Sequence, residues 1–459
     1  MKKLFKSKKL MAALLAIVAA ASCLTACSNT TKNGDTSTIT IGYFEGEYLD
    51  VHWKSWEKLY NEAHPDEKIK LETEGDPSYS TALENLLMTG VVPDIMVAPM
   101  RWKKYASKGW LEPLGDVYSS DFGSGKTIEG ALNDEMKGSI KFNNNYYAVP
   151  FSEYMTGIIV NKGFFDEHEW KLPETMEDMA DIIAKIAELP ENKDENPDND
   201  IYPFTWSGKD ASYYWYYIMN TWWANYGGIN EIKTFKQMES PSVYKTTARE
   251  KAVEALLTLI GGKGTPKNSA TGAVGMTLLE SQMLFTEGRA LMIPNASWFE
   301  VGMSENLPEG FEMVLINAPT IAGGTDENNI YGHVDEWLII PKDAENKSAA
   351  KKFVSFIFSE AGLIDFFEKT NTTSTFTVDY TKANTANLSE FSKSVLSLRM
   401  NSNVFYSESS SPFMSSGLAN FWQYKQITEM ATEGQTAKEI IDYDYNKVVS
   451  DWSTWQTQV

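Results

Sequence analysis

Apolar and polar positions alternate along the first part of the chain with two different periods. Residues 38–44 are mostly β-branched or aromatic and predict a strand. Trp53, Trp56 and Tyr60 then recur at helical spacing before Pro65. The next predicted elements are a strand, a helix and a strand, at 69–73, 79–88 and 94–97. Strands that alternate with helices in this way predict an α/β fold with a mostly parallel sheet and crossover helices.

The alternation continues to the end of the chain. Further strands are predicted at 146–149, 157–160, 289–293, 314–318 and 336–340. Further helices are predicted at 176–189, 213–226, 253–260, 281–286, 349–358, 417–431 and 436–450. The pattern contains no internal repeat. Because 459 residues exceed the length of a single ordinary domain, we expect two lobes.

Residues 1–26 have the pattern of a secretory signal peptide. Five lysines precede an apolar run at 10–21, and small residues follow it. A membrane span needs about 20 apolar residues, so an uncleaved anchor helix is the weaker alternative. Leu-Thr-Ala-Cys at 24–27 resembles the lipobox of bacterial lipoproteins. That resemblance implies a lipid on Cys27 and a protein held at the extracytoplasmic face of the cell membrane. Residues 27–37 are polar and predict a flexible linker.

Charge and cysteine content exclude several classes of protein. The chain has 41 Lys and Arg against 62 Asp and Glu, a net charge of −21, and loss of the signal peptide would remove five lysines and no acid. A chain this acidic repels nucleic acid and anionic membrane surfaces. Cys23 would leave with the signal peptide and Cys27 would carry lipid. The mature domain is therefore expected to have no disulfide and no thiol chemistry.

Five blocks, in order across nearly the whole mature chain, resemble the family 1 extracellular solute-binding proteins of carbohydrate ABC importers. They lie at 81–114, 146–151, 284–300, 337–359 and 418–441. The third contains FTEGRALM, which is close to the family's Phe-x-x-Gly-x-x-Ala-Met signature. Gly90 and Pro93 of the first block also have local explanations. Gly adopts positive φ with little strain at the end of a helix. Pro is tolerated at the first residue of a strand, where no backbone N–H is needed for pairing. Each block alone therefore indicates only the fold. The resemblance to the family rests on the order of the five blocks along the chain.

The resemblance implies an α/β, two-lobed fold of the periplasmic-binding-protein type (class II), with a ligand cleft between lobes that close about a hinge. Lobe one would comprise 38–150 and 319–371, and lobe two 151–318 and 372–459. The implied function is to capture a sugar or oligosaccharide and deliver it to the permease subunits of an ABC transporter, without catalysis. The implied partners are the carbohydrate, the permease and, through the lipid, the membrane. We expect a monomer with no cofactor, no metal and no nucleic-acid partner.

Aromatic residues flanked by polar groups are the candidates for sugar contact. Sugar rings present C–H faces that fit aromatic rings, and their hydroxyls need paired donors and acceptors. Trp298 and Trp422 match family positions that stack on sugar. Phe44, Glu45 and Glu47 follow the first predicted strand, where open α/β sheets bind ligands. The remaining candidate ligand-binding residues are Arg101, Trp102, Glu153, Tyr154, Trp206, Asp335 and Trp337.

Several alternatives stay open at this point. Each candidate Trp has core packing as its alternative role. Arg101 stands where similar proteins often have an acid, which indicates either a charged sugar such as a uronate or an ordinary surface residue. A binding protein for a peptide, a polyamine or a metal chelate is the second functional hypothesis. A secreted glycosidase is the third, and it would need two carboxylates across one cleft.

Motifs for other chemistry are incomplete. The stretch 123–127 reads Gly-Ser-Gly-Lys-Thr, but Ser120 occupies the position of the first glycine of a phosphate-binding loop. The four histidines have no metal-ligand spacing. Residues 194–200 resemble a calcium loop, yet they lack the glycine at its sixth position, and Thr205 replaces the acid at its twelfth. We interpret 194–200 as a solvated turn.

Overall fold

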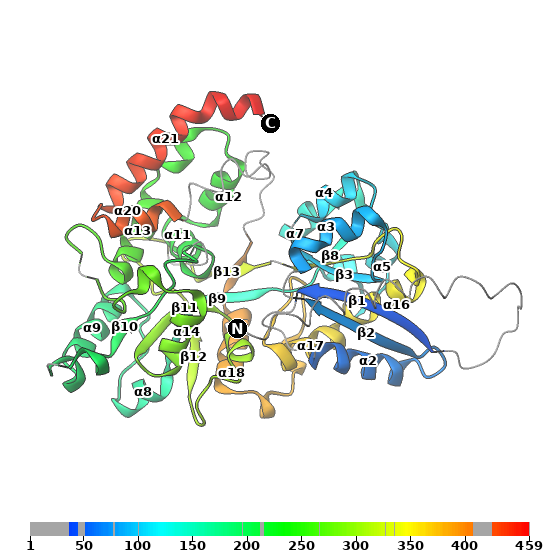
Figure 1. Ribbon diagram of the computed structural model, residues 1–459, viewed down its shortest axis with the longest axis horizontal. Coiled ribbons are helices and arrows are strands. Elements are labelled where there is room, and N and C mark those ends of the chain that lie inside the picture. Colours follow the sequence, from blue (N-terminus) through cyan, green and yellow to red (C-terminus); the bar gives the residue numbers. More distant parts are fainter. Residues whose placement is uncertain are drawn as a thin grey trace, which may run out of the picture.

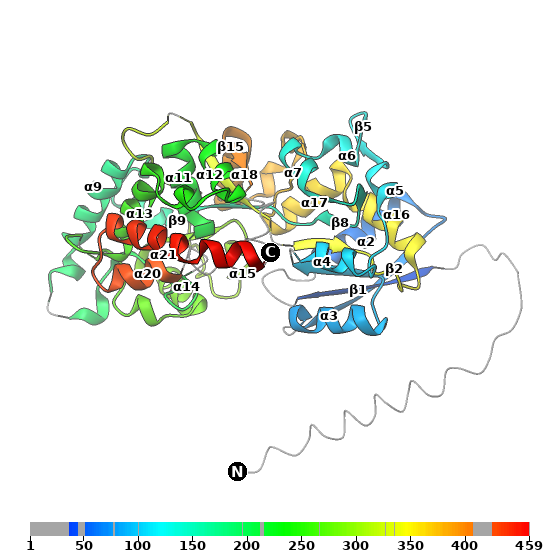
Figure 2. The same cartoon turned by 90° about the horizontal axis from the view of Figure 1, so that it is seen from above.

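The computed structural model shows two α/β lobes side by side (Figure 1), seen from above in Figure 2. Each lobe is built around a β-sheet of its own. The predicted α/β, two-lobed class is therefore confirmed. The structure describes residues 36–44, 51–76, 79–99, 101–194, 196–211, 215–265, 267–325, 327–334, 336–406 and 425–458.

Lobe one contains a five-stranded sheet in the order β2-β1-β3-β14-β8. Strand β1 pairs with β2 and β3 in parallel, and β14 pairs with β3 and β8 in antiparallel fashion. The bounds are β1 (Ser37–Phe44), β2 (Ile69–Asp76), β3 (Ile95–Pro99), β8 (Ala148–Pro150) and β14 (Glu336–Ile339). The main helices are α2 (Val51–Ala63), α3 (Tyr79–Thr89), α4 (Trp102–Ser107), α7 (Asp134–Ser139), α16 (Lys347–Ile357) and α17 (Glu360–Thr370).

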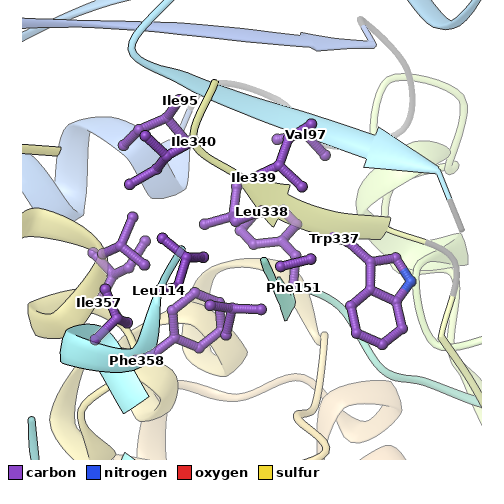
Figure 3. Packing of buried hydrophobic residues seen from close by; sticks show 14 of the residues in the cluster. Ile95, Val97, Leu114, Phe151, Trp337, Leu338, Ile339, Ile340, Ile357 and Phe358 are labelled. Atoms are coloured by element: carbon purple, nitrogen blue, oxygen red, sulfur yellow. The ribbon is translucent and has the colours of Figure 1, made fainter. Parts of the chain in front are cut away.

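The core of lobe one lies between this sheet and its helices (Figure 3). Ala350, Phe353, Val354 and Ile357 are the buried positions of α16. Their spacing of three and four residues places them on one face of the helix. That face packs in a single cluster with side chains of β3 and β14, so the apolar stripe that predicted the helix also fixes its position on the sheet.

Lobe two contains a sheet in the order β10-β11-β9-β13-β15, with β12 paired to β9. Every residue of the central strands β9 and β11 is buried. The bounds are β9 (Tyr154–Asn161), β10 (Tyr202–Phe204), β11 (Ala290–Ala296), β12 (Met313–Ile316), β13 (Asn329–His333) and β15 (Asn403–Phe405). The main helices are α9 (Met176–Ala187), α11 (Asn220–Gly227), α12 (Ile229–Gln237), α13 (Thr247–Ile260), α14 (Leu278–Thr286), α15 (Phe299–Gly302), α18 (Glu390–Asn401), α20 (Lys425–Thr432) and α21 (Ala437–Gln458).

The described residues pass between the lobes three times. The first crossing joins β8 to β9, the second joins β13 to β14, and the third joins α17 to α18. The sequence analysis placed the second crossing near residue 319. Strand β13 nevertheless pairs with β9 and β15 in lobe two, so the sheet changes between His333 and Glu336. Strand pairing over a long sequence distance decides this boundary, and local sequence does not disclose it.

No helix in the described ranges is both long enough and apolar enough to span a bilayer. The segment that would carry the signal peptide, Cys27 and most of the linker lies outside those ranges.

Candidate functional site

The first crossing has two faces with different chemistry. Ser152, Glu153 and Tyr154 run from β8 into β9. Successive side chains of an extended backbone point in opposite directions. Ser152 and Tyr154 therefore lie on one face and Glu153 on the other, and their hydrogen-bond partners differ accordingly.

The inner face consists of Glu153, Thr373, Ser374, Arg399 and Tyr406. The Glu153 side chain has no exposed surface, and Arg399 Nε donates to its Oε2 at 2.8 Å. The Tyr406 hydroxyl donates to Oε1. The backbone of Glu153 exchanges hydrogen bonds with Thr373, and Arg399 Nη2 donates to the Ser374 carbonyl at 3.1 Å. The inner face thus ties the first crossing to the third.

The electrostatics of the inner face match this geometry. Burial lowers the pKa of Arg399, but the charge of Glu153, the nearby Tyr406 and Tyr380 and the hydrogen bond to Glu153 together outweigh burial, so the pKa is raised. Burial, followed by the charge of Glu153, raises the pKa of Tyr406 well above its ordinary value. A buried charge that has lost its partner is very costly, so Arg399 and Glu153 must be kept together. All of the described contacts of the Glu153 carboxylate are structural, although the sequence analysis proposed it as a ligand contact.

The outer face consists of Ser152, Tyr154, His333 and Glu336. The hydroxyls of Ser152 and Tyr154 both donate to Glu336 Oε2, each at 3.4 Å. His333 pairs directly with Tyr154 in the sheet, and their ring centroids are 6.4 Å apart. The Tyr331 hydroxyl lies 3.3 Å from His333 Nδ1. These contacts are longer than those of the inner face and bring together hydroxyl, imidazole and carboxylate groups from the first two crossings.

Two predicted tryptophans meet in lobe one. The ring centroids of Trp102, on α4, and Trp337, on β14, are 5.7 Å apart at a tilt of 44°. Each is 2% exposed. The buried indole nitrogen of Trp337 has no hydrogen-bond partner among the described residues, and in Figure 3 it points away from the other labelled core side chains. A buried N–H without a partner is costly, so this donor is one that a bound polar group would satisfy.

Trp298 lies in lobe two, just beyond the part of β11 that pairs with the start of β9. It follows β11, whose next residue Ser297 donates its backbone N–H to Met155 of β9 at 2.9 Å. Trp298 and Tyr154 consequently belong to the same apolar cluster. Trp298 is 5% exposed, so its ring is covered in this arrangement of the chain.

The structure places Trp206 elsewhere. Its indole nitrogen donates to Ser269 Oγ at 3.0 Å, and its ring packs in the separate core cluster of lobe two. A small pocket beside it is lined by Leu256, Leu259, Ile260, Pro294 and Thr428. These contacts satisfy both the polar and the apolar parts of the indole, which is the pattern of a core residue.

Phe44 and Arg101 occupy strand and helix ends of lobe one. Phe44 ends β1 with 44% of its surface exposed, and Arg101 is an exposed residue that precedes α4. Glu45, Glu47, Asp335, Trp422 and Cys27 lie outside the described residues.

The sequence analysis missed Ser152, His333 and Glu336. Ser152 and Glu336 are each adjacent in sequence to a candidate residue. Strand alternation applied to 152–154 would have separated Ser152 and Tyr154 from Glu153. His333 gave no local signal, because it approaches Tyr154 only through the pairing of β13 with β9. The described ranges contain no group of three or more His, Cys, Asp or Glu side chains that could hold a metal ion.

Two lobes that each carry a sheet, joined by polar crossings, define a class of two-lobed binding proteins. The chain belongs to the bacterial extracellular solute-binding protein family, whose model matches residues 47–364. It is 24% identical over 363 residues to the multiple sugar-binding protein of Streptococcus mutans, an alignment that covers 77% of this chain and 80% of that protein.

Solved structures share the fold. One from a study of xylan utilisation by Caldanaerobius polysaccharolyticus gives a TM-score of 0.68 at 15% identity, covering 90% of this chain and 100% of the other. The unliganded form of RafE from Streptococcus pneumoniae gives a TM-score of 0.63 at 17% identity, covering 91% and 98%. RafE in complex with raffinose gives 0.61, also at 17% identity, covering 90% and 98%.

Proposed function

We propose that this protein is the lipid-anchored, extracytoplasmic solute-binding component of an ABC transporter and that its solute is a sugar or an oligosaccharide. The outer face carries the proposal, because the hydroxyl of Tyr154 and the carboxylate of Glu336 meet there and Trp298 belongs to the same apolar cluster as Tyr154. An aromatic ring can cover the C–H face of a sugar while the polar groups pair with its hydroxyls. Family membership and the sugar-binding relatives support the same class of ligand.

Capture would proceed by closure of the two lobes. Trp102 and Trp337 belong to lobe one and Trp298 to lobe two. A ligand stabilises a closed arrangement only if it makes contacts that the open arrangement lacks. Because all three rings are covered in the present arrangement, we expect the segments around them to move when a ligand enters. Movement of lobes about a few hinge residues is an established way to achieve this.

A ligand screen tests the class of solute. Mono- and oligosaccharides, including uronates, are compared with peptides and polyamines by thermal shift and then by calorimetry. A glycan present at a hundred times its Kd adds about 2.7 kcal/mol to the free energy of unfolding, which raises the melting temperature of a chain of this length by roughly 3 °C. Saturable binding of a peptide or polyamine, with none for any glycan, would refute the sugar assignment. Cleavage of a glycan during incubation would favour the glycosidase instead.

The lipid anchor is tested separately. A lipid on Cys27 would hold the protein near its permease, and such a tether raises the effective concentration of the loaded protein there. We expect Cys27→Ser to move the protein from the membrane fraction to the medium with its glycan affinity unchanged. Retention of the variant in the membrane fraction would contradict the anchor without bearing on the ligand.

A further inference from the structure

Glu300 lies two residues after Trp298, on α15, and binds the start of the third crossing. Its Oε2 accepts hydrogen bonds from Asn371 Nδ2 at 2.8 Å and from Ser389 Oγ at 2.9 Å. Ser392 Oγ lies 3.3 Å from the same oxygen and 2.5 Å from Asn371 Oδ1. A hydroxyl has one proton to donate, so Ser392 donates to the nearer Asn371. Glu300 and Ser392 thus hold the Asn371 amide from both of its ends.

Asn371 is a special backbone position. It follows α17 as the C-cap residue, has the left-handed values φ 56° and ψ 14°, and is buried. Among residues with a side chain, Asn adopts this conformation with unusual ease. The segment that joins α17 to α18 begins here, and Thr373 and Ser374, which belong to the inner face, follow at once. Thr375 and Thr377 then form backbone hydrogen bonds with Asn133 and Ala131 of lobe one. The position of Asn371 therefore sets the start of the third crossing.

The two ends of α18 contact two different hydrogen-bond networks, one around Glu300 and one around Glu153. Ser389 is the N-cap of this helix and accepts the Ser392 backbone N–H at 3.0 Å. Ser389 and Ser392 lie at the Glu300 end, whereas Arg399, near the other end, binds Glu153. A single helix therefore contacts the turn that carries Trp298, the third crossing and the first crossing.

The short helix α15 has an apolar anchor as well as a polar one. Phe299 is fully buried, and its ring packs edge-on against Phe285 of α14 at 5.5 Å. Glu300, on the next position, binds Asn371. Phe299 packs in an apolar cluster that also contains Phe367 of α17, whereas Glu300 makes a direct hydrogen bond from α15 to the residue that follows α17.

We propose that Glu300 is a positioning residue for Trp298, and that through Asn371 it couples glycan contact at Trp298 to movement of the third crossing. The coupling rests on the proposed function, because it takes Trp298 to be a ligand contact. Loss of the Glu300–Asn371 bond leaves the binding groups in place but lets the Trp298 turn move independently of the crossing. Glycan affinity falls as a result.

Three variants isolate this bond. Glu300→Gln removes the charge at nearly constant size. Asn371→Gly removes the amide while keeping a backbone conformation that Gly adopts readily. Glu305→Gln is the matched control, because Glu305 is an exposed glutamate in the turn that follows α15. We expect each of the first two to weaken binding of the glycan found in the screen by roughly three- to tenfold and the pair together to cost no more than one alone. The control binds as the natural protein does.

The same variants in a Trp298→Leu background separate positioning from general stability. Leu keeps an apolar side chain at this buried position, so the background is expected to fold. If Glu300 acts through Trp298, Glu300→Gln costs no further affinity there. A loss that persists in that background, or normal binding by both Glu300→Gln and Asn371→Gly, would overturn the proposal. If Trp298→Leu itself binds the glycan with normal affinity, Trp298 does not stack on the glycan, and that part of the proposed function is refuted.

A measurement without ligand distinguishes failure of the stacking assignment of Trp298 from failure of the positioning role of Glu300. In fluorotryptophan-labelled protein, the fluorine resonance of Trp298 is assigned by its loss in Trp298→Leu. We expect Glu300→Gln and Asn371→Gly to shift or broaden that resonance and Glu305→Gln to leave it unchanged. An unaltered resonance in both variants would refute positioning even if no glycan binds.

Discussion

The inner and outer faces of the first crossing differ in how firmly their polar groups are held. On the inner face, Glu153 is fully buried and both of its carboxylate oxygens have close partners. On the outer face, Glu336 is half-buried, and the two hydroxyls that reach it are at 3.4 Å. One extended segment of three residues thus presents a buried ion pair to one side and longer hydrogen bonds to the other. The comparison separates residues that hold the crossings together from residues that we propose contact the solute.

The largest expected effect is on the inner face. Arg399→Met leaves the Glu153 carboxylate buried without its cation, and breaking a buried pair in this way costs about 3–5 kcal/mol. Urea unfolding of the ligand-free protein measures the loss. Lys58→Met is the control, because it breaks a pair with Glu62 whose side chains are 76% and 62% exposed; exposed pairs contribute about 1 kcal/mol or less. Equal losses in the two variants would remove the distinction between the faces.

The next effect compares two buried tryptophans. Trp298→Leu should weaken glycan binding at least about tenfold, which is about 1.4 kcal/mol, because the aromatic face for the sugar is lost. Trp206→Leu should lower the melting temperature while leaving affinity unchanged, since that indole is satisfied by Ser269 and core packing. Calorimetry and thermal unfolding on both variants decide the matter. Loss of glycan affinity in Trp206→Leu would show that Trp206 belongs to the binding site.

Local sequence predicted much of the fold. The helices predicted at 176–189 and 349–358 match α9 (Met176–Ala187) and α16 (Lys347–Ile357) to within two residues. Each has a clear apolar stripe, and α9 also begins with a capping box between Thr175 and Asp178. These signals lie within one helix and need no distant partner.

Elements that depend on distant partners were not predicted. Strand β13 (Asn329–His333) was missed because its pairing with β9 and β15 defines it. The predicted helix at 213–226 instead contains a π-helical turn (Trp215–Met219) before α11, which is set by packing rather than by periodicity. The candidate site divides in the same way. Strand alternation places Tyr154 and Glu153 on opposite faces, but the buried, structural character of the Glu153 face depends on Arg399, 246 residues away.

A smaller effect is expected on the outer face. Glu336→Gln removes the charge but keeps an oxygen that can accept from the hydroxyls of Ser152 and Tyr154, so the free energy of unfolding should change by about 1 kcal/mol or less. A hydrogen bond from a sugar hydroxyl to a charged acceptor contributes about 1.5 kcal/mol or more, and its loss should weaken binding about tenfold. Ser152→Ala, which keeps the carboxylate, should bind glycan more tightly than Glu336→Gln. A large loss of stability with unchanged glycan affinity would show that Glu336 stabilises the fold, as the inner face does, and does not bind the glycan.

The smallest effect concerns an ion pair between the lobes. Glu135 on α7 and Lys233 on α12 lie 3.7 Å apart. Burial raises the pKa of Glu135, and the Lys233 charge offsets this only in part. The folded protein then binds the Glu135 proton more tightly than the unfolded chain does. Its contribution to stability is therefore largest at low pH and falls as pH rises from the ordinary value of 4.5 through the folded pKa.

Glu135→Gln should remove that part of the pH dependence and change stability at neutral pH by about 1 kcal/mol or less. Urea unfolding from about pH 4 to 7 measures it, with Glu62→Gln as the exposed control. If the slopes of Glu135→Gln and the natural protein coincide, Glu135 is solvated as in the unfolded chain. The Lys233 charge would then contribute nothing to stability that titrates in this range.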